Sequence, residues 1–105
     1  MSGRRSRNKG MRGERALVRF FQSHGLAAEK ISGMYRPGAD LSLPLLGVDR
    51  EVEVKVRAHG FRELYAWLAG RDILVIRADR REPLCVVPLR LAAEIAVAAE
   101  RARKP

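Results

Sequence analysis

The chain has 105 residues, of which 47% are hydrophobic and 31% are charged, a composition typical of a globular protein. This length supports one compact domain with a single core. No apolar run approaches the ~18 residues of a membrane span, and the charged N-terminus lacks the apolar segment of a secretory signal. We therefore expect neither a disordered, a fibrous nor a membrane-spanning protein.

The charge balance is the strongest signal in the composition. Lys and Arg number 21 against 12 Asp and Glu, so the formal net charge is +9, and 17 of the 21 basic residues are arginine. The arginine side chain is well shaped for bidentate phosphate contacts, and so basic a small domain is typical of nucleic-acid binding. The alternative is a basic surface that only keeps the protein in solution.

The N-terminal segment, residues 1–9, is basic and has no apolar periodicity. We predict a flexible basic arm there, followed by a single domain over residues 10–105. Such an arm either becomes ordered on phosphate groups or serves as a solubilising tail.

The first predicted helix covers residues 10–24. Leu17, Val18 and Phe21 recur at helical spacing and form its apolar stripe. Glu14 shares that stripe, where a carboxylate is costly without a compensating partner. Glu14 is therefore a candidate functional residue.

Short strands and turns follow, with two further helices. Strands are predicted at 27–31, 40–43, 51–57, 72–77 and 84–87, a turn at 44–49, and helices over 61–68 and 89–103. The segment 72–77, whose residues 73–76 are all apolar, predicts a central strand. The order is α-β-β-β-α-β-β-α, which indicates the α/β class with one small mixed sheet flanked by helices.

Several apolar side chains beyond the first helix are expected in the core. They include the stripe of the second helix, Phe61, Leu64, Tyr65 and Leu68, and the single cysteine, Cys85. Trp67 lies off that stripe and is interpreted as a dimer contact or as an edge of the core. A lone cysteine forms no internal disulfide, so we expect a cytoplasmic protein.

The segment Glu53-Val54-Lys55 presents a carboxylate and an ammonium group on one face of a strand. Alternate residues lie about 6.6–6.8 Å apart along a strand. Asp40 lies thirteen residues before Glu53, across a predicted turn, so a hairpin would bring the two carboxylates onto adjacent strands. These two carboxylates and the Val54 backbone carbonyl suit Mg²⁺, and Mn²⁺ is a possible substitute.

This set of residues fits phosphodiester hydrolysis. The metal would polarise the scissile phosphate and lower the pKa of a bound water. Lys55 would orient that water and offset charge in the transition state, and Glu14 would reach the cluster from the first helix. Two alternatives stay open: a solvated strand face with no chemistry, and Glu51 in place of Glu53 as the second acid.

Three short motifs carry a resemblance to a known family. Gly13-Glu14, Gly38-Ala39-Asp40 and Glu53-Val54-Lys55 resemble the PD-(D/E)XK nuclease pattern, with Ala39 where the signature has proline. Within that superfamily the chain is most similar to the archaeal-type Holliday junction resolvases, including their phage and mobile-element relatives, over about residues 8–90. The Ser32-Gly33 loop and the basic start before the first-helix glutamate are shared features.

The resemblance implies a restriction-endonuclease-like core and a homodimer that cuts opposed strands of a four-way DNA junction, as in recombination and repair. Asp40 and Glu53 would be metal ligands, Lys55 the catalytic lysine and Glu14 the helix-one acid. Ser32 would lie in the loop near the cleaved strand.

DNA would be held by contacts to phosphate. The candidate cations are Arg4, Arg5, Arg7, Lys9, Arg12, Arg15, Arg36 and Arg57. No motif reads base edges in a groove, so we expect selectivity for DNA shape. Alternatives are a related nuclease acting on duplex ends, flaps or restriction sites, and a non-catalytic nucleic-acid-binding protein of the same fold.

Overall fold

The protein consists of three helices and five short strands among the residues that the structure describes. This structure, a computed structural model, describes residues 3–31 and 39–104, with side chains in the first helix from Gly13 onwards. The elements are α1 (Gly3–Ser23), β1 (Glu29–Lys30), β2 (Leu41–Leu45), β3 (Val48–Val52), α2 (Arg62–Leu68), β4 (Leu74–Ile76), β5 (Leu84–Val86) and α3 (Leu89–Arg103). Their order along the chain is α-β-β-β-α-β-β-α, and both sheets are antiparallel.

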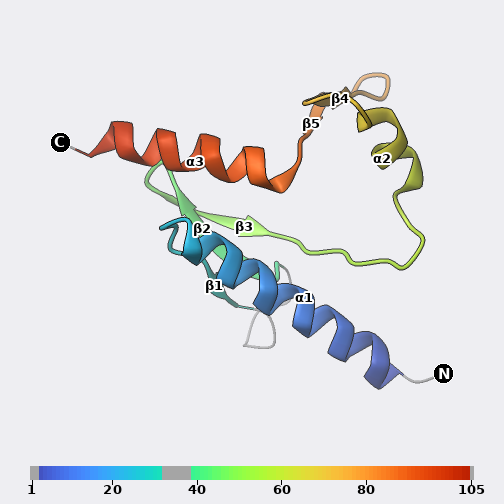
Figure 1. Ribbon diagram of the computed structural model, residues 1–105, viewed down its shortest axis with the longest axis horizontal. Coiled ribbons are helices and arrows are strands. Elements are labelled where there is room, and N and C mark those ends of the chain that lie inside the picture. The colour runs from blue at the N-terminus through green and yellow to red at the C-terminus, as the bar shows by residue number, and fades with distance from the viewer. Residues whose placement is uncertain (1–2, 32–38, 105) are drawn as a thin grey trace.

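Helix α1 begins seven residues before the predicted start at Gly10. Residues 3–9, expected to form a flexible arm, have helical backbone and continue α1 away from the sheet (Figure 1). Extending an existing helix requires no new nucleation, and Arg and Lys have good helix propensity, so the basic segment follows the helical turns formed by residues 13–23. The helix ends at Ser23, and Gly25, two residues beyond, turns the chain with a positive φ of 83°.

Strands β1, β2 and β3 form one sheet in that order. The hairpin turn between β2 and β3 consists of Leu46 and Gly47, both with positive φ, which is the two-residue geometry that matches strand twist. The predicted turn over 44–49 was too long, and β3 lies earlier than the predicted strand 51–57. The pattern of alternating valines could not locate this turn, because Leu46 carries none of the usual turn chemistry.

The core lies between α1, this sheet and the middle of α3. Its buried residues are Phe21, Leu26, Ala28, Leu41 and Leu43, and Val52, Val54, Ala96 and Val97 pack against them. The predicted stripe of α1 therefore has the predicted inward orientation. No helix in the described part of the chain is long and apolar enough to span a bilayer.

Residues 61–88, called here the α2–β4–β5 unit, lie apart from the core (Figure 1). An extended segment connects β3 to α2, and among the residues that the structure describes β4 pairs only with β5. The structure thus has two separate antiparallel sheets, and the prediction of one mixed sheet with a central strand at 72–77 was wrong. Helix α2 has no buried residue and Cys85 is exposed, so the predicted burial of both was also wrong.

The reason for these errors is that apolar patterning records which face of an element is suited to burial, without recording which partner covers it. In the single chain no described partner covers the apolar faces of β4, β5 and α2. Their side chains remain open to solvent, Tyr65 with 74% and Val75 with 63% of their surface exposed.

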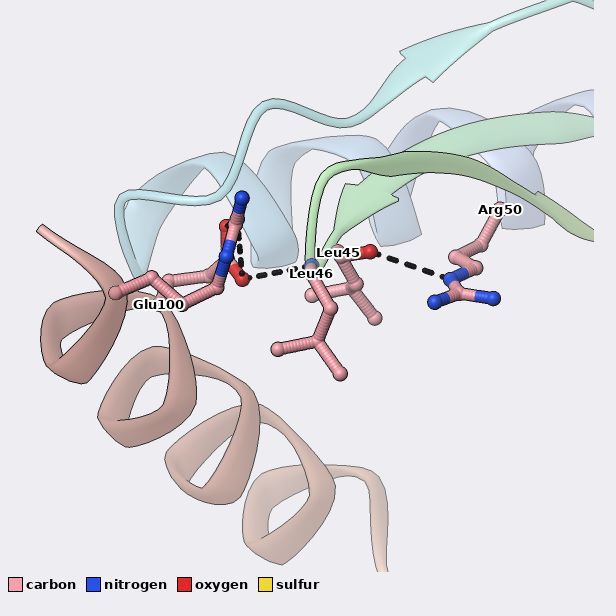
Figure 2. Close-up of polar contacts among 5 residues, drawn as sticks. Leu45, Leu46, Arg50 and Glu100 are labelled. Carbon is pink, nitrogen blue, oxygen red and sulfur yellow. Dashed lines mark hydrogen bonds and ion pairs between the residues drawn. The ribbon is translucent and has the colours of Figure 1, made fainter.

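Helix α3 is tied to the β2–β3 turn by polar contacts (Figure 2). The Leu46 backbone N–H donates to Glu100 Oε2 at 2.8 Å, and Arg103 Nη1 lies 3.2 Å from Glu100 Oε1. Arg50 Nε donates to the Leu45 carbonyl at 3.2 Å on the other side of the turn. These contacts hold the end of α3 against the hairpin that carries the candidate site.

Candidate functional site

Asp40 is held at the start of β2 by three hydrogen bonds. Its carboxylate oxygen Oδ2 accepts from the Val54 backbone N–H at 2.7 Å, and its own N–H donates to the Val52 carbonyl at 2.9 Å. Its carbonyl accepts from the Ile31 N–H at 3.0 Å, which links it to the end of β1 as well. The half-buried Asp40 side chain therefore lies beside the segment that continues β3.

Glu53 is placed next to Asp40 by the register of the hairpin. The register pairs end at Leu41 and Val52, and the hydrogen bonds of Asp40 to the Val52 carbonyl and the Val54 N–H then hold Asp40 alongside the Glu53 backbone. Glu51 pairs instead with Ser42, two residues further along β2, so the register favours Glu53 over Glu51 as the neighbour of Asp40.

Lys55 and Glu53 face the same side of the chain, as the spacing predicts. Lys55 Nζ lies 2.9 Å from Glu53 Oε2, and both side chains are about half exposed. An ion pair this open to solvent contributes little to folding stability. The two groups are therefore accessible to a ligand.

Glu14 approaches this segment from helix α1. It is the one buried charged residue among the described side chains, with 6% of its surface exposed. Its neighbour Gly13 allows a close approach, because a Cβ built at Gly13 would lie 3.0 Å from Val56 Cγ2. Val56 belongs to the valines that alternate with Glu53 and Lys55 along the chain, so α1 packs on the valine side of the segment.

A groove of about 500 Å³ opens beside the Glu53–Lys55 pair. Its opposite wall comes from α2 and from the chain between β5 and α3, and it is largely apolar. The lining residues there are Phe61, Leu64, Tyr65, Leu68, Val86, Val87, Pro88 and Leu89. Phe61 holds a left-handed backbone conformation, with φ of 65°, at the start of α2, and such backbone strain in a non-glycine residue is frequent near functional sites.

Sequence reasoning did not find this wall of the groove. Phe61, Leu64, Tyr65 and Leu68 were expected in the core, because an apolar helical stripe is normally buried. The signal available in the sequence was the charged and glycine-containing segment 57–60 between the two elements, which separates α2 from β3.

The predicted DNA-binding residues fall into three groups. Arg15 and Arg57 are exposed, and Arg57 Nη1 donates to the Val56 carbonyl at 2.9 Å. Arg4, Arg5, Arg7, Lys9 and Arg12 belong to the helical backbone of α1, and their side chains lie outside the described part of the structure. Ser32 and Arg36 lie outside the described residues altogether.

The carboxylates of Asp40 and Glu53 are the oxygen donors available here for a divalent metal. Asp40 and Glu53 bring two carboxylates to neighbouring positions, and one Asp40 oxygen remains beyond the Oδ2 that accepts from Val54. Oxygen donors of this kind suit Mg²⁺, which takes few protein ligands and keeps several waters. Within residues 3–31 and 39–104, no group of three or more His, Cys, Asp or Glu side chains converges.

Comparisons with protein-family models, with curated proteins and with solved structures gave no match to this chain.

Proposed function

We propose that this protein is a metal-dependent endonuclease that hydrolyses phosphodiesters in branched DNA, with the four-way junction as its substrate. The observation that carries the proposal is the Asp40 carboxylate, hydrogen-bonded to Val54 beside the Glu53–Lys55 pair. Two acids and a lysine at the end of a hairpin, in a chain of net charge +9, are the groups needed to act on a polyanion. The finer fold we propose is the restriction-endonuclease-like core, and because the single chain keeps its strands in two separate antiparallel sheets, we propose that this core is completed only in a cytoplasmic homodimer.

Each residue has a defined part in the proposed reaction. Asp40 and Glu53 would hold Mg²⁺ or Mn²⁺, with the Val54 carbonyl as a further oxygen donor. Such a metal, when bound, polarises the phosphate and acidifies a coordinated water. Lys55 donates hydrogen bonds from Nζ, which orient the attacking water and offset negative charge on the phosphoryl oxygens in the transition state.

Binding of the substrate would come from the basic side chains. Arg15 and Arg57 are exposed, and the basic positions of α1 extend along the helix beyond the sheet. Contacts of this kind are independent of base sequence and weaken steeply with salt. A homodimer with two-fold symmetry would match the symmetry of a four-way junction and act on two opposed strands.

The test is strand cleavage by the full chain on a synthetic four-way junction and on linear duplexes and flaps made from the same arms. Each substrate is incubated with Mg²⁺, with Mn²⁺ and with EDTA. We expect paired, metal-dependent nicks in the junction and a loss of about 10²-fold or more in Asp40→Asn and Lys55→Met. Asp40→Asn keeps a side-chain oxygen that can accept from the Val54 N–H, so it removes the charge while preserving the local hydrogen bond.

Matched variants on β3 and directly after it identify which acid is the second metal ligand. Asp49→Asn removes an exposed carboxylate elsewhere on the strand and is expected to cut like the wild type. Glu53→Gln is expected to lose activity and Glu51→Gln to retain it, because Asp40 binds the residues on either side of Glu53 whereas Glu51 pairs with Ser42. Cleavage of duplexes or flaps in preference to the junction would support the nuclease activity but contradict the four-way junction as its substrate. Tight DNA binding with no cleavage under either metal would contradict the enzymatic activity and indicate a non-catalytic DNA-binding protein.

A further inference from the structure

The single chain exposes far more surface than a compact protein of its size. Its accessible surface is 8710 Å², about 2800 Å² more than the ~5900 Å² expected for a folded monomer of 11.8 kDa. Its radius of gyration is 15.5 Å, against about 13 Å for a compact domain of this length. A stable protein interface buries about 1200–2000 Å² in total, so the excess surface is sufficient for one.

Much of the exposed apolar surface lies in and around the α2–β4–β5 unit. None of residues 44–92 is buried, although this stretch contains two apolar strands and an amphipathic helix. Large apolar side chains with more than half their surface exposed include Tyr65, Trp67, Ile73, Val75 and Leu84. A two-stranded hairpin is marginally stable in water by itself, so this unit requires a covering surface.

The three-stranded sheet offers such a surface at the outer edge of β3. In the described part of the chain, β3 pairs with β2 on one side and with no strand on the other. Exposed strand edges are prone to pair with a further strand. Val48 is half exposed at that strand, and residues 48–53 carry three acidic groups and one basic group. Residues 71–82 carry four basic and three acidic groups, so their net charge is positive whereas that of residues 48–53 is negative.

We propose that two copies of this chain associate by placing the α2–β4–β5 unit of each against the β1–β2–β3 sheet of the other, with its hairpin pairing to the outer edge of β3. The inference rests on the homodimer of the proposed function. It does not depend on whether the protein cleaves DNA. The occupant is a second copy because each chain exposes both halves of the contact and the extended segment 53–60 holds them apart. A two-fold axis satisfies both contacts at once and closes the assembly.

This arrangement makes the candidate site depend on both copies. Glu53 and Lys55 directly follow β3, so a hairpin docked on that edge lies beside them. Each groove would then be bordered by elements of the partner. The exchanged dimer would therefore add a wall from the partner to a groove that the single chain lines with its own α2 and the chain between β5 and α3.

The first test is the solution mass of the full chain by sedimentation equilibrium without DNA. We expect about twice 11.8 kDa. Val75→Lys places a charge on an exposed residue of β4, and we expect it to shift the protein to monomer, whereas Ala98→Lys on the exposed side of α3 stays dimeric. A monomeric wild type, or a dimer unaffected by Val75→Lys, would overturn the inference.

The second test locates the contact and uses the single cysteine, Cys85, in β5. A bismaleimide with a reach of about two strand spacings (~10 Å) is added to wild type, to Asp49→Cys and to Asp49→Cys/Cys85→Ser. We expect a cross-linked dimer from Asp49→Cys alone. A dimer band in wild type or in Asp49→Cys/Cys85→Ser would mean contact between like elements, and a cross-linked monomer would mean that the unit folds onto its own sheet. Any of these results rejects the exchange, and none of them bears on cleavage.

Discussion

Asp40 contributes both to the structure of the hairpin and to the proposed metal site. One of its carboxylate oxygens accepts from the Val54 N–H, which aligns the segment after β3 with the start of β2. Together with the bond from its own N–H to the Val52 carbonyl, this contact determines which acid lies beside Asp40, because Glu53 stands between Val52 and Val54. A single aspartate thus organises the hairpin end and contributes half of the proposed ligand pair.

Substitutions at the adjacent turn residues Leu46 and Gly47 are expected to change the free energy of unfolding in opposite directions. Both have positive φ, of 55° and 79°. Gly47→Ala is expected to lower the free energy of unfolding by about 1–2 kcal/mol, because a Cβ disfavours the left-handed region. Leu46→Asn is expected to raise it by about 1 kcal/mol, because asparagine tolerates this conformation and the leucine side chain is exposed. Urea denaturation measures both, and destabilisation by Leu46→Asn would contradict the turn geometry.

Among the elements, α3 is linked to the β2–β3 hairpin by the Glu100 carboxylate. The hydrogen bond from the Leu46 N–H lowers the pKa of Glu100, and Arg103 and Lys104 add to this effect. A carboxylate whose pKa is lowered by folding stabilises the protein above its unfolded pKa of about 4.3. That contribution is lost as the pH falls from there through the lower pKa of the folded state.

Glu100→Gln should therefore lower Tm near neutral pH, with the difference from wild type shrinking as the solution is acidified below about pH 4.3. Thermal unfolding followed by circular dichroism across this range measures the effect. Glu94→Gln removes the same charge from an exposed position on α3 and serves as the control. A difference between wild type and Glu100→Gln that stays constant through the acid range would show that the ionised carboxylate does not hold the turn.

On the scale of the whole molecule, the elongated single chain should be less stable than the assembled one. If two copies cover each other's α2–β4–β5 unit, unfolding is coupled to dissociation and Tm rises with protein concentration. We expect this rise in wild type over a hundredfold range of concentration and its loss in Val75→Lys. Calorimetry measures it, and a Tm in wild type that is independent of concentration would contradict association through this surface.

Local patterns in the sequence were sufficient for the elements and for the set of candidate site residues. The stripe of Leu17, Val18 and Phe21 faces the core, and the order of helices and strands is the predicted one. The pairing of Lys55 with Glu53 follows from their spacing. These features depend on contacts between near neighbours, which the helical and strand periods record directly.

The tertiary structure alone decided two other features. It decided that Asp40 lies beside Glu53 and not beside Glu51, through a two-residue hairpin turn shorter than the predicted turn over 44–49. It also decided that the strands at 74–76 and 84–86 form their own sheet away from the core. An apolar pattern specifies a face to be buried, whereas the surface that buries it is chosen by contacts between distant parts of the chain or between chains, and the local periodicity is the same in either case.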